Sequence, residues 1–237
     1  MLPRQDWKLE SVLRLFMILF LGLATVGLAS NLADRLAGGE PDEARQALVG
    51  LIGTMVFQVV ALGAVGWFVR ENRTTWGEAF GLREDRLAWL ALVAVAATVA
   101  VFPISLALMW VSQKVMMWLS LEVVAQPTVR ALEAVNSIGQ KLLFGAMAVL
   151  LAPVVEEVVF RGILYPTIKG LGYRRAALWL TAFVFALTHA NAVTFLSLVF
   201  LAVLLTLLYE QTGSLWAPIG AHGLFNLANF TWLLLGR

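Results

Sequence analysis

The segment from Leu142 to Pro166, LLFGAMAVLLAPVVEEVVFRGILYP, decides how the rest of the chain folds. Its first fourteen residues carry no charge, Glu156 and Glu157 then follow side by side, and Arg161 comes four residues after the second glutamate. Charges at membrane depth cost roughly 2.5–3.5 kcal/mol each on insertion scales, so they usually mark a function. Two adjacent carboxylates cost more because they repel each other. We therefore expect other helices to bring compensating groups to this segment.

The composition predicts a helical membrane protein. Of the 237 residues, 60% are hydrophobic and the mean hydropathy is +0.83, which is too apolar for an ordinary soluble domain. We expect an all-α bundle of about seven (six to eight) transmembrane helices, forming a single integral-membrane domain over residues 1–237 with an intramembrane active site. A net charge of +2 without a basic tail gives no indication of nucleic-acid binding. The lack of cysteine excludes disulfides and thiolate chemistry.

Apolar runs along the chain place the expected spans. We predict spans at about residues 12–29, 47–69, 87–111, 142–166, 176–189, 193–209 and 215–235. The stretch from 112 to 141 is harder to assign: residues 115–121 can extend the third span, and 127–140 fit a short amphipathic helix or an ordered loop. The first run also resembles a signal peptide with a cleavage site near residue 29, but its length favours a retained span.

The distribution of Lys and Arg predicts the orientation in the membrane. With the N-terminus inside, ten Lys and Arg residues lie in cytoplasmic connections and six on the other side. We therefore expect a cytoplasmic N-terminus. The Ala/Leu/Val-rich composition and the short loops suggest a multi-pass protein of a bacterial cytoplasmic membrane.

Two histidines and an asparagine join the charged residues as candidates. His189 lies in FALTH and His222 in HGLFN, both within expected spans, and Asn226 follows His222 by one helical turn. Arg161 is four residues after Glu157, so these two are expected to form an ion pair on one helix. Glu156 points about 100° away and has no such partner, which leaves it free for chemistry.

Each candidate alone also has a structural explanation. A transmembrane histidine often only donates a hydrogen bond between helices, Asn226 is a common type of packing residue, and Glu157 with Arg161 can be a purely structural pair. Counted from the connection at 169–175, however, Glu156 and His189 both lie roughly 20 Å into the membrane at about 1.5 Å per residue. Together the residues point to one site.

Three motifs carry a resemblance to a known family. EEVVFR (Glu156, Glu157, Arg161), FALTH (Phe185, His189) and HGLFN (His222, Asn226) resemble, in order, the EExxxR, FxxxH and HxxxN motifs of the CPBP family of intramembrane proteases. This family includes the type II CAAX prenyl endopeptidases and bacterial Abi-type proteins linked to bacteriocin processing and self-immunity. The resemblance covers about residues 142–229.

The resemblance implies a role for each candidate. Glu156 and His189 would activate water, His222 and Asn226 would stabilise the oxyanion, and Glu157 with Arg161 would orient the site. The implied activity is that of an intramembrane endopeptidase of the glutamate type. The expected substrate is a membrane-associated protein or peptide, either prenylated or a peptide precursor, and the composition favours a peptide precursor or membrane-associated segment cut near the cytoplasmic leaflet.

Three alternatives stay open at this point. Glu156, His189 and His222 can form a Zn²⁺ site with an open position for water, although the chain has no HExxH and we favour a mechanism without a cofactor. A catalytically inactive membrane scaffold or immunity protein can share the same fold. A proton-coupled transporter would have ionisable residues spread across the bilayer, whereas here they gather in the C-terminal half.

Overall fold

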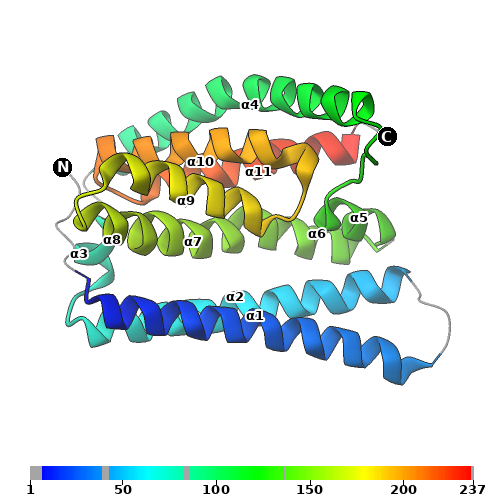
Figure 1. Cartoon of the computed structure of the whole chain (residues 1–237), viewed down its shortest axis with the longest axis horizontal. Coiled ribbons are helices and arrows are strands. Elements are labelled where there is room, and N and C mark those ends of the chain that lie inside the picture. Colours follow the sequence, from blue (N-terminus) through cyan, green and yellow to red (C-terminus); the bar gives the residue numbers. More distant parts are fainter. Residues whose placement is uncertain (1–6, 39–42, 83–85, 136, 236–237) are drawn as a thin grey trace.

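The computed structural model describes residues 7–38, 43–82, 86–135 and 137–235, and every regular element in these ranges is a helix. This confirms the expected all-α membrane bundle. The longer helices run roughly parallel to one axis (Figure 1). The bounds of the first five helices are α1 (Leu9–Ala37), α2 (Glu43–Glu71), α3 (Trp76–Phe80), α4 (Leu87–Trp118) and α5 (Pro127–Ala134).

The segment with the two glutamates forms one long helix with two π-helical stretches. It begins as α6 (Ile138–Ala146), widens in η1 (Met147–Leu151), continues as α7 (Ala152–Glu157), widens again in η2 (Val158–Leu164) and ends as α8 (Tyr165–Gly170). After it come the last three helices, which are α9 (Arg174–Thr188), α10 (Ala192–Thr212) and α11 (Trp216–Leu235).

Five helical segments are long and apolar enough to cross a membrane, and they contain the first, second, third, fourth and sixth expected spans. They are Leu9–Ala33, Arg45–Glu71, Leu87–Trp118, Ile138–Gly170 and Ala192–Thr212. The third reaches Trp118, so residues after 111 do extend it. The short helix expected within 127–140 is α5, which ends at Ala134.

The fifth and seventh expected spans form helices that do not meet these criteria. Helix α9 has 15 residues, about 22 Å at 1.5 Å per residue, whereas the hydrocarbon core is about 30 Å thick. Helix α11 has 20 residues but carries the polar His222, Asn226 and Asn229. Both helices lie beside α10 (Figure 1). His189 directly follows α9 and His222 lies in α11, so the candidate histidines belong to the two helices with the weaker span character.

Helix α10 is the centre of the bundle and the α1–α2 pair is its edge. In α10, 61% of the apolar span is buried, against 11% in α1. Helices α4, α9 and α11 pack around α10, while α1 packs mainly on α2 and the pair forms a separate layer (Figure 1). The glutamate helix lies between these two parts, so its charged residues face the interior.

Two prolines explain where the glutamate helix meets its neighbours. Pro153 and Pro166 have no N–H, so neither can donate the backbone hydrogen bond that would continue the helix after η1 and η2. Near Pro166, the Gly162 carbonyl accepts a hydrogen bond of 3.1 Å from the Trp7 indole. This bond holds the start of α1 against the core. Pro153 follows η1, which packs against α11.

Candidate active site

The buried carboxylate of Glu157 contacts a residue of its own helix, Arg161, and a residue of the last helix, His222. Glu157 and Arg161 are both fully buried, and Arg161 Nη1 donates to Glu157 Oε1 at 2.9 Å. His222 Nδ1 lies 2.8 Å from the same oxygen. The ion pair therefore forms as the spacing in the sequence predicts, and it also connects η2 to α11 through the imidazole.

Arg161 and Phe185 complete the buried layer around this pair. Arg161 Nη2 donates to the carbonyl of Ala202 in α10 at 3.1 Å, and its guanidinium carbon lies 4.6 Å from the centre of the Phe185 ring. The Phe185 ring centre lies 4.9 Å from that of His189 and 5.7 Å from that of His222. Phe185 thus packs against both histidines and positions their rings. It belongs to the motif FALTH, but the spacing of the motif alone did not predict this packing role.

Glu156 occupies a different environment from its neighbour. Its side chain is 27% exposed, and its Oε2 is buried without a hydrogen-bond partner in the described part of the chain. This oxygen lies 3.8 Å from His222 Nε2, which is too far for a direct hydrogen bond. The structure therefore shows the difference that the spacing predicts: Glu157 forms an ion pair on its own helix, and Glu156 does not.

His189 lies slightly outside its expected helix. It is the C-cap residue of α9 rather than an interior residue of a span, because the chain turns there into α10. Its Nδ1 is 2.9 Å from the Phe185 carbonyl, which leaves Nε2 as the nitrogen available to other partners. The structure links His189 to His222 through the Phe185 ring that both contact.

Asn226 and Gly223 fit α11 against the π-helical turn η1. Asn226 Nδ2 donates to the Ala148 carbonyl at 2.8 Å. A Cβ on Gly223 would lie 2.7 Å from the Val149 carbonyl oxygen, so only glycine allows the two backbones to approach this closely. Sequence reasoning singled out Asn226 but missed Gly223 and Pro153. The available signal was the proline, since it cannot donate a helical hydrogen bond to the carbonyls of the preceding turn.

We expect the Gly223→Ala variant to be destabilised by about 1–3 kcal/mol, the usual cost of overpacking, because its Cβ would displace α11 from η1. Gly63→Ala in α2 is the matched control, since nothing lies within 4 Å of that Cβ. Unfolding in mixed detergent–SDS micelles measures both. Equal stability of the two variants would show that α11 can shift at no cost.

The positions of the candidate donor atoms can be compared with the arrangement that a bound metal ion requires. In the described ranges, no group of three or more His, Asp or Glu side chains is arranged to hold a metal ion. His222 Nδ1 is occupied by Glu157, and Glu156 approaches only the Nε2 atom of that ring. The residues named for a zinc site, Glu156, His189 and His222, do not converge as three ligands would, and we route no catalytic step through a metal.

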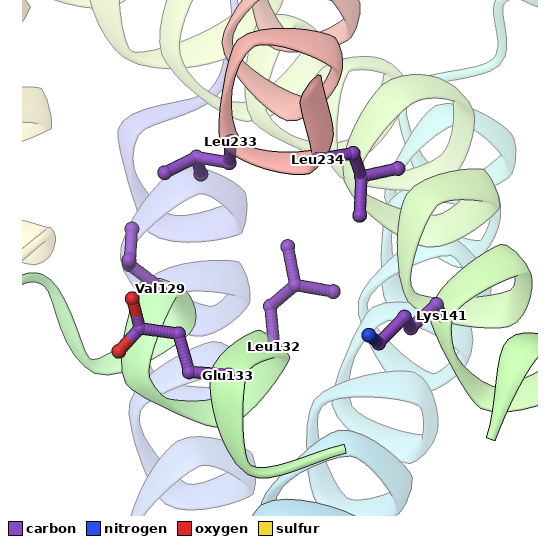
Figure 2. A pocket seen from close by; sticks show the side chains of 6 residues that line it. All are labelled: Val129, Leu132, Glu133, Lys141, Leu233 and Leu234. Carbon is purple, nitrogen blue, oxygen red and sulfur yellow. The ribbon is translucent and has the colours of Figure 1, made fainter. Parts of the chain in front are cut away.

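A small cavity lies apart from these residues. It is lined by Val129 and Leu132 with Glu133 on α5, by Lys141 on α6, and by Leu233 and Leu234 at the end of α11. Figure 2 shows the Leu132 side chain reaching into it between the two leucines of α11 and Lys141. None of the six candidate catalytic residues lines this cavity, and nothing in the structure identifies an occupant.

The comparison with protein families identifies the core of the chain. Residues 138–228 match the family model described as type II CAAX prenyl endopeptidase Rce1-like. This segment belongs to the CPBP family. The CPBP segment runs from the start of α6 into α11 and contains all six candidate residues, and because the family is one of CAAX-type intramembrane proteases, it supports a peptidase. No curated protein and no solved structure matches the chain.

Proposed function

We propose that the chain is an intramembrane endopeptidase in which Glu156 is the general base. One observation carries the proposal: Glu156 Oε2 has no hydrogen-bond partner in the described ranges and faces His222 Nε2 across 3.8 Å. Glu157 differs in that its Oε1 is paired with Arg161 and His222, although its Oε2 also has no hydrogen-bond partner among the described residues. The Glu156 side chain is 27% exposed, so water can reach this carboxylate.

The arrangement supports a hydrolytic sequence that uses only residues of this chain. A water held by Glu156 attacks the substrate carbonyl carbon, and Glu156 accepts the proton that the water loses. The tetrahedral oxyanion is stabilised by His222 and by the second amide hydrogen of Asn226. When the C–N bond breaks, the proton passes from Glu156 to the leaving amine. His189 contacts the Phe185 ring that also contacts His222, which supports a positioning role for it rather than direct contact with this water.

Glu157 has a supporting role in this proposal. Its contact with His222 Nδ1 fixes the orientation of the ring, as carboxylates do for catalytic and metal-bound histidines. It also stabilises a ring that is protonated on both nitrogens throughout, so that Nδ1–H donates to Glu157 and Nε2–H can donate to the oxyanion. Arg161 balances the buried charge of Glu157. The pair thus positions His222 without contacting the substrate.

The setting of the site supports a substrate class. We propose a membrane-associated protein or peptide precursor, because two helical segments of the CPBP segment, Ile138–Gly170 and Ala192–Thr212, are long and apolar enough to span a membrane. The start of α1, helix α3 and the start of α9, which belong to parts of the chain expected to be cytoplasmic, lie at the same end of the bundle (Figure 1). This grouping supports a cytoplasmic N-terminus, since that end carries the excess of Lys and Arg.

The proposed function is tested with purified protein and a library of quenched fluorescent apolar peptides in detergent. Cleavage by the wild type together with its loss in Glu156→Gln would support the peptidase. Substrates trapped on the Glu156→Gln variant can then be identified by mass spectrometry. Absence of cleavage by the wild type would favour the scaffold function, and equal cleavage by both proteins would exclude Glu156 as the base.

A chelation experiment tests the metal-free mechanism. We expect the rate of peptide cleavage to stay within twofold of its initial value after exhaustive dialysis against a strong chelator, because the proposed steps use protein groups alone. The matched sample is dialysed without chelator. Loss of activity with recovery on addition of Zn²⁺ would overturn the expectation and point to Glu156, His189 and His222 as ligands in a rearranged site.

A further inference from the structure

One face of α4 packs against α10 and α11, which lie along it (Figure 1). Its buried residues are spaced three, four or seven apart and are Leu90, Ala94, Thr98, Val101, Ser105 and Ser112. The hydroxyls of Ser105 and Ser112 have no hydrogen-bond partner among the described residues, whereas the hydroxyl of Thr98 is bonded. Thr98 lies in a segment that can cross a membrane and outside residues 138–228, the CPBP segment. The family match therefore gives Thr98 no role.

The Thr98 hydroxyl reaches α11 at the residue before His222. Thr98 Oγ1 lies 2.9 Å from the Ala94 carbonyl oxygen and 3.1 Å from that of Ala221, and it donates its single hydrogen to these two acceptors. The first contact is the one that a threonine in a helix makes with the carbonyl four residues earlier. The second contact crosses to α11. The Ala221 carbonyl and the His222 N–H belong to one planar peptide unit, so Thr98 bonds the unit that carries His222.

Contacts on both sides hold the same turn of α11. On the α4 side, a Cβ on Gly220 would lie 3.2 Å from the Cβ of Ala94, so the two helices are close at this point. On the other side, Gly223 lies against the backbone of η1. The His222 ring itself lies 2.8 Å from the Glu157 carboxylate. The ring is therefore held by a carboxylate and the backbone by close packing, and the Thr98 bond is a directional contact from α4.

We infer that Thr98 is a positioning residue for the proposed reaction, which holds the backbone of α11 so that His222 Nε2 meets the tetrahedral oxyanion. The inference rests on the proposed function, because that function places His222 at the oxyanion. A valine would fill nearly the same space in an apolar helix, so burial alone does not require the hydroxyl. A hydrogen bond is directional, so it fixes the rotation of this turn more closely than an apolar contact does. Misplacing a catalytic group by about 1 Å can cost about 10²-fold in rate.

The first test compares two substitutions of Thr98 with the best-cleaved peptide of the fluorescent library. Thr98→Val removes the hydroxyl, and we expect kcat to fall about three- to tenfold, the size of one net hydrogen bond, with KM within twofold. The loss falls on kcat because the oxyanion exists only during the reaction. Thr98→Ser keeps a hydroxyl and should restore kcat to within twofold of the wild-type value.

Thr54→Val is the matched control, since Thr54 Oγ1 donates to the Gly50 carbonyl of its own helix. We expect this control to keep the kcat and KM of the wild type. An unchanged kcat in Thr98→Val, or a loss in Thr98→Ser or Thr54→Val equal to that in Thr98→Val, would overturn the proposal.

A second test separates the hydrogen bond from the packing between α4 and α11. The Phe102 ring centre lies 6.0 Å from that of Phe225, one turn further along the same two helices. Phe102→Leu loosens this packing and leaves the Thr98 hydroxyl in place, so we expect lower stability with kcat within twofold of the wild-type value. Unfolding in mixed detergent–SDS micelles gives the stability of both variants. If kcat falls with stability alike in Phe102→Leu and Thr98→Val, Thr98 acts through general packing and the inference is wrong.

The two proposals fail in different ways. If Glu156→Gln retains kcat, the peptidase mechanism is wrong whatever the Thr98 variants do. If Glu156→Gln is inactive but Thr98→Val keeps the kcat of the wild type, the peptidase stands and the positioning role is wrong. Thr98→Ala gives an independent measurement should Thr98→Val fold poorly, because alanine also lacks the hydroxyl and is smaller than threonine. We expect it to lower kcat as Thr98→Val does, and a wild-type kcat in Thr98→Ala would contradict the inference.

Discussion

Replacing Glu156 by glutamine is expected to lower kcat/KM for peptide cleavage by about 10²–10⁴-fold, the usual contribution of a general base. Glutamine has nearly the same shape but cannot accept a proton at neutral pH. The loss should appear in kcat rather than KM, because the carboxylate acts on water and not on substrate binding. Initial rates with the best-cleaved fluorescent peptide measure both constants.

The same variant should keep its stability, which separates a catalytic role from a structural one. Glu156 Oε2 has no partner in the described ranges, so its replacement removes no hydrogen bond of that atom. We expect the melting temperature of Glu156→Gln to equal or exceed that of the wild type. Glu10→Gln is the matched control, since Glu10 is an exposed carboxylate and should change neither activity nor stability. A large loss of stability in Glu156→Gln would indicate that the carboxylate holds the fold.

Periodicity and spacing predicted much of this arrangement. The hydrophobic runs placed the long helices, because apolar length is nearly sufficient to identify a membrane helix. The four-residue spacing predicted the pair of Glu157 and Arg161, because residues four apart share one helical face. The same argument singled out Glu156 as the carboxylate without a partner on its own helix.

What spacing could not predict were the contacts between helices. The bond from Glu157 to His222 depends on how α11 crosses the glutamate helix, and no local pattern encodes a crossing. The π-helical turns were also missed, although Pro153 was a usable signal for a freed carbonyl. Helix α9 ends at Thr188 and places His189 in a turn, because the chain must reverse there to enter α10. Apolar composition alone could not predict that α9 ends at Thr188.

The largest effect on stability is expected at Arg161. The Arg161→Met variant leaves the fully buried Glu157 without its cation, and breaking a buried ion pair by removing one partner costs about 3–5 kcal/mol. Arg161 also bonds the Ala202 carbonyl, so α10 loses a contact as well. Arg14→Met is the matched control, because the Arg14 side chain is 40% exposed and partly exposed pairs such as those it forms with Glu10 and Glu71 contribute about 0–1 kcal/mol each. Unfolding in mixed detergent–SDS micelles measures both.

A double variant shows whether the cost of Arg161→Met arises from the unpaired charge. In Glu157→Gln with Arg161→Met, neither charge remains, while the glutamine oxygen can still accept a hydrogen bond from His222 Nδ1. We expect most of the lost stability to return, since buried pairs replaced together are often nearly neutral. Activity should stay low, because a neutral amide stabilises a charged His222 ring less than a carboxylate does. Recovery of full activity with stability would mean that the buried pair serves the fold alone, and Glu156 with His222 would then carry the chemistry without it.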